Sequence, residues 1–248
     1  MAEHKDLYQW SRKEAERSGE LDNWLESYRE NCICARAIEN AISRYYTDNR
    51  LNPDGAKECI KQFGFDRVNW VLANTVQEGK EDGRYHKENK DWARGFNIPK
   101  DKDSWNYRFA VTAHPALVDL FIDQTRKEWQ KLGLYDRSHC YDENMDFTGK
   151  VVVINPRSLK DEYKTPEYQL FYASTGNGCR PDAIGTKVFG QYLKDGERSW
   201  LRRSEFIGVM KLELLPDWAQ EKYAALSAEK QEAQPSQTNP NDGMGEPK

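Results

Sequence analysis

A glycine-rich segment at residues 175–181 is the first part of the sequence whose residue types suggest chemistry. It reads Thr-Gly-Asn-Gly-Cys-Arg-Pro and lies between two apolar runs. Successive backbone N–H groups of small residues can converge on an anion, and Arg180 would add a positive charge beside it. The alternative is a plain connection between two strands, because the segment lacks the lysine of a P-loop and no helical pattern follows it. A nucleophilic role for Cys179 would need a base beside it, and a lone cysteine among glycines is more often a packing residue.

The residues that follow form a basic and aromatic set. Its members are Arg180, Lys187, Lys194, Arg198, Trp200, Arg202 and Arg203, with Tyr172 and Tyr192 nearby in the sequence. At alternating strand positions, such side chains can follow a phosphate backbone and stack on bases, or they can anchor a partner protein. The alternative is a solvated outer face with Trp200 turned into the core. Residues 148–210 hold ten Lys and Arg against seven Asp and Glu, a small excess beside that of dedicated nucleic-acid-binding domains.

A second candidate is a polar cluster with an aromatic anchor in residues 79–107. Arg84 and Trp92 are its proposed binding residues, close in sequence to Asp82 and Asn89. Irregular ordered segments carry binding residues more often than regular elements do. The cluster could equally be a clasp that fixes the local fold.

The remaining chemistry-bearing residues do not form a recognisable site. The five cysteines and four histidines are scattered, without the spacing of a zinc site or a metalloprotease. We therefore expect no catalytic residue, no metal and no cofactor. An odd number of cysteines without a secretory leader indicates thiols in a reducing cytoplasm. No apolar stretch reaches the ~20 residues of a membrane helix, so we expect no membrane partner.

The elements that would position these residues follow from the spacing of apolar side chains. Up to residue 147 the spacing is helical, and it predicts helices at 6–18, 21–46, 53–63, 65–78, near 87–94 and at 115–132. From residue 148 short β-type runs occur at 150–155, 168–174, 186–193, 199–203 and 206–210. Turn-forming residues separate them, including Lys194-Asp195-Gly196, which suits a hairpin.

This pattern predicts an α+β fold with two domains. Residues 1–147 form a helical domain with an irregular polar excursion. Residues 148–229 form a small antiparallel, β-barrel-like (SH3-like) domain with a closing helix. Residues 230–248 are polar, lack apolar anchors and are expected to be a disordered tail.

Five blocks of the sequence stand out: Asn31-x-x-Cys34 before AIENAI, FGFDRVNWVLANTVQ (63–77), DGRYHKENKDWA (82–93), TAHPALVDLFIDQTRKEW (112–129) and LPDWAQEK (215–222). Together they resemble a bacterial family of unknown function that is frequent in conjugative transposons and other mobile elements. The resemblance covers most of residues 7–225, and FGFDRVNWVLAN and LPDWAQEK are its most specific parts. The family often has serine where this chain has Ala113, which argues against an essential hydroxyl there. The resemblance implies an accessory module in a setting rich in anti-defence factors, and it carries over no catalytic residue.

The leading hypothesis is therefore a cytoplasmic, non-enzymatic binding protein of a mobile genetic element. It would be an anti-defence factor of the anti-CRISPR or antirestriction type that contacts a host protein or ribonucleoprotein complex. Two alternatives stay open. One is a nucleic-acid-binding accessory factor that uses the basic β segment, and the other is a nucleotide- or RNA-acting enzyme that uses the glycine-rich loop. The oligomeric state does not follow from the sequence.

Overall fold

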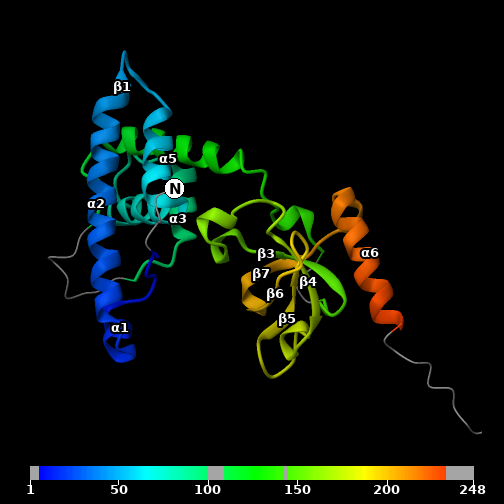
Figure 1. Cartoon of the computed structure of the whole chain (residues 1–248). Coiled ribbons are helices and arrows are strands. Elements are labelled where there is room, and N and C mark those ends of the chain that lie inside the picture. The colour runs from blue at the N-terminus through cyan, green and yellow to red at the C-terminus, as the bar shows by residue number, and fades with distance from the viewer. Residues whose placement is uncertain (1–5, 100–108, 142–144, 233–248) are drawn as a thin grey trace, which may run out of the picture. The chain divides into compact units, whose positions relative to one another are not determined.

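The computed structural model describes residues 6–99, 109–141 and 145–232, and the chain divides into two compact units, Met1–Gly133 and Leu134–Lys248 (Figure 1). The first unit is built from helices, and the second from an antiparallel sheet followed by a helix. The predicted α+β fold is thus confirmed. Among the described residues, none of the helices has the length and apolar character that crossing a bilayer requires.

The first unit contains the helices α1 (Arg12–Ser18), α2 (Leu21–Tyr45), α3 (Asp54–Glu78), α4 (Lys87–Arg94) and α5 (Pro115–Gln130). Helices α2 and α3 run side by side (Figure 1) and share a buried apolar core with residues of α5. Helix α1 begins later than the sequence predicts. Ser11 Oγ accepts the N–H of Glu14, and the carboxylate of Glu14 accepts the N–H of Ser11. This capping box fixes the first helical residue at Arg12.

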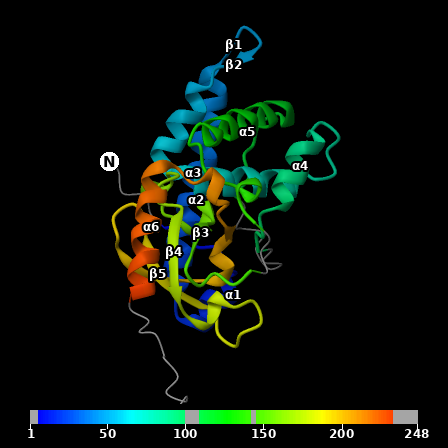
Figure 2. The same ribbon diagram turned by 90° about the vertical axis from the view of Figure 1, so that its right-hand side faces the viewer.

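Helix α3 contains the break that the sequence predicts between residues 63 and 65. Gly64 has φ 77° and ψ 160°, a conformation that favours glycine, so two helical segments join there at a kink. A short hairpin of β1 (Tyr46–Thr47) and β2 (Arg50–Leu51) connects α2 to α3 and forms the tip of this unit (Figure 2). Asp48 and Asn49 at its turn both have positive φ. The sequence does not predict this hairpin, because two-residue strands leave no periodic pattern.

The second unit contains the strands β3 (Lys150–Ile154), β4 (Leu170–Thr175), β5 (Lys187–Tyr192), β6 (Arg198–Arg202) and β7 (Phe206–Val209), followed by α6 (Asp217–Glu232). All pairings are antiparallel, in the order β6-β5-β4-β3-β7. One 3-10 turn, η1 (Arg137–His139), precedes β3, and five lie between these elements: η2 (Pro156–Ser158), η3 (Asp161–Tyr163), η4 (Asn177–Cys179), η5 (Arg203–Glu205) and η6 (Leu212–Leu214).

The sheet must curl, because its two outermost strands are consecutive in the chain. Strands β6 and β7 lie at opposite ends of the sheet order, and only η5 joins them. In a flat sheet of five strands these edges would lie about 19 Å apart. The step from Arg202 to Phe206 spans at most about 14 Å. The N–H of Arg203 bonds to Thr186 O and the N–H of Asn155 bonds to Glu205 O. These bonds tie η5 to the residue before β5 and to the residue after β3, as the predicted barrel-like form requires.

The curl gives the sheet an inner and an outer face. Val152, Phe171, Val188 and Phe206 pack together inside. On the outer face, α6 covers residues of β3 and β4. Its Ala219 and Tyr223 pack with Val151, Val153, Leu170 and Tyr172.

The second unit begins before residue 148, where the sequence analysis places the boundary. Cys140 forms an isolated bridge with Met210, and the ring of Phe147 packs against Phe206 with centroids 5.8 Å apart. The segment before β3 thus belongs to the β-rich core. Helix α6 continues to Glu232, past the expected start of the tail at 230, because Ala, Glu, Lys and Gln favour helix. The rest of the predicted tail, 233–248, lies outside the described residues.

Candidate functional site

An exposed face on β5 and β6 carries most of the basic and aromatic side chains of the second unit that the sequence singled out. Side chains alternate along a strand, so Val188, Tyr192 and Leu201 point inward. The residues between them point outward. We call this outward set the basic–aromatic face: Lys187, Phe189, Gln191, Arg198, Trp200 and Arg202.

The residues of this face pair directly across the two strands. Phe189 is the antiparallel partner of Trp200, and Lys187 is the partner of Arg202. Phe189 is 44% exposed and Trp200 is 45% exposed. The ammonium group of Lys187 lies 4.1 Å from the centroid of the Trp200 ring, within the range of a cation–π contact. The alternative that turned Trp200 into the core is therefore wrong.

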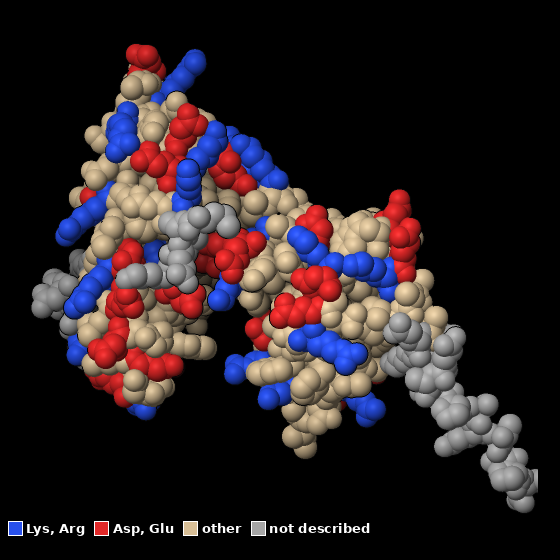
Figure 3. Space-filling view, in the orientation of Figure 1, with Lys and Arg blue, Asp and Glu red and all other residues tan. Residues whose placement is uncertain are grey.

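The basic–aromatic face lies beside the part of the sheet that α6 covers. Helix α6 packs over β3 and β4, and Figure 3 shows lysine and arginine side chains over the region that Figure 1 labels β5 and β6. In the described part of the chain, β6 is an edge strand paired only with β5. Its outer edge can accept another strand. The face thus combines aromatic surface, positive charge and an open strand edge.

The arrangement of charges on this face does not favour stability. Lys187 and Arg202 are directly opposed on the same side of the sheet, and like charges in that position destabilise a pair of strands. The outward side chains comprise three cations, two aromatic rings and one amide, without a carboxylate. Such a set can stack on planar groups and attract negative charge.

Arg203 does not belong to this face. Its guanidinium group donates to the carbonyl oxygens of Gly178 (3.1 Å), Cys179 (2.8 Å) and Met145 (2.9 Å). It also lies 3.9 Å from the centroid of the Phe147 ring. Because these contacts tie three backbone segments together, Arg203 is a structural residue, in contrast to the binding role expected for it.

The glycine-rich segment is explained by close packing against the start of β5. A Cβ atom on Gly176 would lie 2.3 Å from Lys187 O, and one on Gly178 would lie 2.2 Å from Thr186 O. Cys179 is fully buried, and its thiol donates to Thr175 O at 3.1 Å. It cannot reach a substrate in this arrangement. Arg180 is exposed at the end of the segment, and its N–H bonds to Asn177 O.

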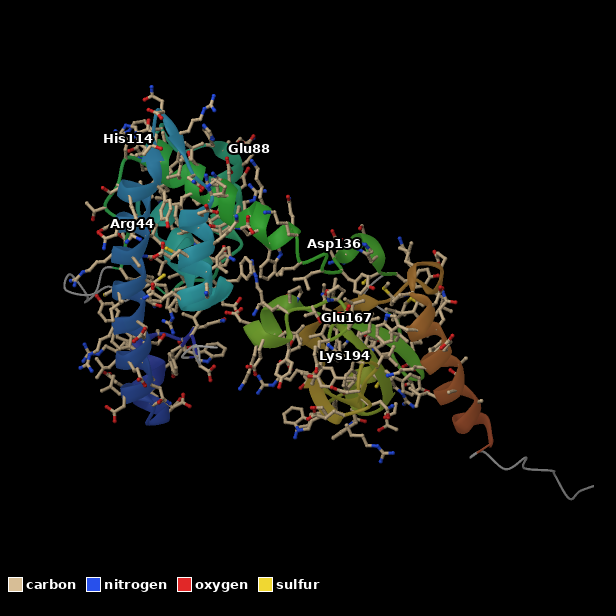
Figure 4. The ribbon with its side chains drawn as sticks, turned by 45° about the horizontal axis from the view of Figure 1, so that its top comes forward. Arg44, Glu88, His114, Asp136, Glu167 and Lys194 are labelled. Carbon is tan, nitrogen blue, oxygen red and sulfur yellow. The ribbon has the colours of Figure 1, made fainter. Side chains whose placement is uncertain are left out.

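Lys194 lies in the turn between β5 and β6. Its ammonium group is 4.3 Å from the centroid of the Tyr168 ring. Figure 4 shows Lys194 close to Glu167, and the pKa of the Glu167 carboxyl is lowered by the neighbouring Thr165 side chain and its own backbone, with a contribution from Lys194. Lys194 therefore contacts the segment before β4 rather than the basic–aromatic face.

The two candidates in the first unit serve the local fold. The guanidinium group of Arg84 donates to Asp82 at 2.7 Å, and this bond lowers the pKa of Asp82 to about 2. The Trp92 ring packs against the apolar core and lies edge-on to Phe96, with centroids 5.0 Å apart. Of the two open interpretations, the structure favours the clasp.

One cluster that the sequence analysis did not consider resembles a catalytic triad by residue type. Asp136 Oδ1 lies 2.9 Å from His139 Nδ1 and accepts the hydroxyl of Ser138 at 2.6 Å. Ser138 Oγ lies 3.4 Å from the same ring nitrogen, Nδ1. In a triad the serine and the acid contact different ring nitrogens. Asp136 also accepts the N–H of Ser138, so the cluster caps η1.

Phe189 and Gln191 are the two members of the face that the sequence did not single out. The signal was available, because Phe189 alternates with Val188 and Gly190 and is two residues from Lys187. Within the described residues, no group of three or more His, Cys, Asp or Glu side chains is placed to hold a metal ion. None of the five cysteines is in a disulfide.

Comparison with known proteins assigns the chain to a family whose activity is unknown. None of the curated proteins and none of the solved structures matches this chain. Residues 7–130 match the family described as "Protein of unknown function (DUF3849)". That match spans the helices of the first unit and ends before the β-rich unit that carries the basic–aromatic face. The chain therefore belongs to the DUF3849 family of proteins of unknown function.

Proposed function

We propose that this chain is a non-enzymatic binding protein that contacts a partner protein through the basic–aromatic face. The observation that carries the proposal is the exposed Phe189–Trp200 pair beside the opposed cations Lys187 and Arg202. A surface optimised only for folding would not place two large aromatic side chains and two like charges side by side in solvent.

The composition of the face suits a protein interface. Tryptophan and arginine are the residues most often found where a few contacts carry most of the binding energy. The outward side chains carry a positive excess, so the matching partner surface would be acidic. The open edge of β6 adds backbone groups to which a partner strand could pair.

The biological setting of this proposal comes from the sequence resemblance. The blocks quoted above resemble proteins of conjugative transposons and related mobile elements. A binding protein in that setting would act against a host defence protein or ribonucleoprotein complex, of the CRISPR–Cas or restriction type. Such an inhibitor needs a rigid surface with a few strong anchors, which the sheet supplies.

The test is a capture experiment with host lysate and matched variants. The double variant Phe189→Ala/Trp200→Ala removes the aromatic pair. The control, Leu212→Ala/Leu214→Ala, removes two other exposed apolar side chains of the same unit. We expect wild type and control to retain the same defence protein or complex, and the Phe189/Trp200 variant to lose it by about tenfold or more. Equal retention by all three folded proteins, or capture of no defence component, would contradict the proposal.

A second candidate, single-stranded nucleic acid, is favoured by the absence of a carboxylate among the six outward side chains. Aromatic rings flanked by cations bind single strands by stacking and phosphate contact. With three cations on the face, a plot of the logarithm of the binding constant against the logarithm of the salt concentration should have a slope of about −2. The measurement is fluorescence anisotropy with labelled DNA and RNA 12-mers, compared with Arg198→Gln/Arg202→Gln. No binding at low salt would remove this candidate and leave the protein partner.

A further inference from the structure

The first unit contains a small pocket with aromatic walls. Its volume is about 60 Å³. Six aromatic side chains line it: Tyr8, Trp10, Trp24, Tyr28, Trp70 and Phe109. Trp24 and Tyr28 form one stacked pair, with centroids 5.4 Å apart and planes at 11°. The pocket is smaller than the roughly 150 Å³ of a cavity that holds benzene, so it suits a small group rather than a whole ring.

Two polar side chains, Ser27 and Asn31, also line this pocket. Behind them lies the buried guanidinium group of Arg67, which is 3% exposed. It donates to Ser27 O at 2.9 Å, to the backbone carbonyl of Asp6 at 3.0 Å and to Asn31 Oδ1 at 2.5 Å. Residues of the Asn31 block and of the FGFDRVNWVLAN block, far apart in the sequence, therefore meet at this pocket.

The bond from Arg67 fixes the orientation of the Asn31 amide. A guanidinium group is only a donor, so the atom of Asn31 that it contacts must be the oxygen. The other end of the amide, Nδ2, carries two N–H donors. Asn31 is 3% exposed, and among the described residues its Nδ2 has no hydrogen-bond partner. This Nδ2 is not one of the fully enclosed polar atoms without a partner among the described residues, and it belongs to a side chain that lines the pocket.

The charges around the pocket restrict what could accept this hydrogen bond. A cation is disfavoured because the group that Asn31 offers is an N–H donor, and because the guanidinium carbon of Arg12 lies 6.0 Å from the Trp24 centroid. An anion is disfavoured by the aromatic walls, since burial of a charge among apolar groups is costly. The acids Glu30, Asp6 and Glu26 interact with Arg67 as well and offset its charge. A neutral acceptor between aromatic rings remains.

We propose that this pocket binds a small uncharged group with a carbonyl oxygen, such as the carboxamide of an Asn or Gln side chain, which accepts a hydrogen bond from Asn31 Nδ2. Aromatic rings would enclose the rest of the group. This site lies in the family-matched unit and is independent of the basic–aromatic face.

The experiment uses the full-length chain and three probes of similar size: acetamide, acetate and tetramethylammonium. ¹H–¹⁵N NMR follows the side-chain amide signal of Asn31 and the indole signals of Trp10, Trp24 and Trp70. Acetamide should shift these signals with saturation in the millimolar range, as expected for so few atoms. Acetate and tetramethylammonium should bind at least tenfold more weakly.

The matched variant is Asn31→Asp, because a carboxylate keeps an acceptor for Arg67 and replaces the donor that lines the pocket with a negatively charged acceptor. We expect it to fold and to bind acetamide at least about tenfold more weakly. Asn40→Asp, an exposed position on the same helix, makes the same charge change and should bind like wild type. If acetamide produces no saturable shift, the pocket holds water only and the proposal is wrong. It is also wrong if acetate or tetramethylammonium binds as well as acetamide, or if Asn31→Asp retains full affinity.

Discussion

Phe189 on β5 and Trp200 on β6 are directly opposed residues, and 44% of the first and 45% of the second is exposed. Phe171, on the neighbouring strand β4, is fully buried and packs inside the curled sheet. The same residue type therefore serves two purposes in one sheet. One phenylalanine stabilises the core, and the other is available to a partner.

Replacement of these two phenylalanines should separate the two purposes. Phe171→Ala should lower the free energy of unfolding by about 3–5 kcal/mol, because it empties a buried site. Phe189→Ala should cost less than about 1 kcal/mol, because only an exposed cross-strand contact is lost. Urea denaturation followed by circular dichroism measures both. A cost for Phe189→Ala close to that of Phe171→Ala would show that this side chain is part of the core.

Removal of one cation from the opposed pair should not weaken the fold. Arg202→Gln relieves the repulsion with Lys187, so the free energy of unfolding should stay constant or rise by about 0.2–0.5 kcal/mol. Partner binding through the face should fall in the same variant. Thermal unfolding measures the change in stability, and the capture experiment measures the change in partner binding. A loss of more than about 1 kcal/mol would show that Arg202 makes a stabilising contact.

Arg203 should behave in the opposite way. Arg203→Ala leaves the carbonyl oxygens of Gly178, Cys179 and Met145 without their charged donor, and it should cost about 2 kcal/mol or more. Arg203→Lys should recover only part of this, since an ammonium group cannot replace a planar fork of donors. Urea denaturation is the measurement, with Arg202→Gln as the neighbouring control. Full stability of Arg203→Ala would contradict the structural role.

The glycine-rich segment gives a further stability prediction. Gly178→Ala would place a Cβ atom 2.2 Å from Thr186 O, and the backbone must move to relieve this overlap. We expect a cost of about 1–3 kcal/mol. Asn177→Ala, an exposed position in the same turn, should change stability by less than about 0.5 kcal/mol. The midpoint of urea denaturation is compared between the two variants and wild type. An unchanged midpoint for Gly178→Ala would leave the glycine without a packing role.

The Asp82–Arg84 pair predicts a local pH dependence. Hydrogen bonds from Arg84 lower the pKa of Asp82 to about 2. Because the folded pKa is below the ordinary value near 3.9, the contact stabilises the clasp above pH 4 and is lost as the pH falls through about 2. NMR titration of the Asp82 carboxyl should show this midpoint. Arg84→Ala should raise the pKa of Asp82 toward the ordinary value. Lys80 pairs with Glu81 instead, so Lys80→Ala should leave the pKa of Asp82 unchanged.

The helices and strands were largely predictable because their signals are local. The spacing of apolar residues predicted α2, α5 and the two segments of α3, and Gly64 predicted the break between those segments. The β-type runs gave each strand of the sheet within two residues at either end. The β1–β2 hairpin was missed, since its strands are too short to show a period. The start of α1 was misplaced, because the cap at Ser11 outweighed the apolar residues before it.

The site was only partly predictable. Alternation along a strand correctly grouped Lys187 with the other outward residues, and it placed Arg198, Trp200 and Arg202 together on β6. Sequence could not show which of the adjacent residues Arg202 and Arg203 is bound by carbonyl oxygens. Nor could it bring Asn31 to Arg67, which contact each other across 36 residues of sequence.

The sequence by itself determined the two types of structure in this protein, the position of most elements and which side chains alternate along each strand. These properties depend on neighbours within a few residues, through backbone preference and apolar period. Only the tertiary structure decided which outer strands stay uncovered, which arginine is bound by carbonyl oxygens and where six aromatic rings enclose a pocket. Those outcomes depend on packing between distant segments, such as α6 against β3 and β4, and no local pattern encodes them.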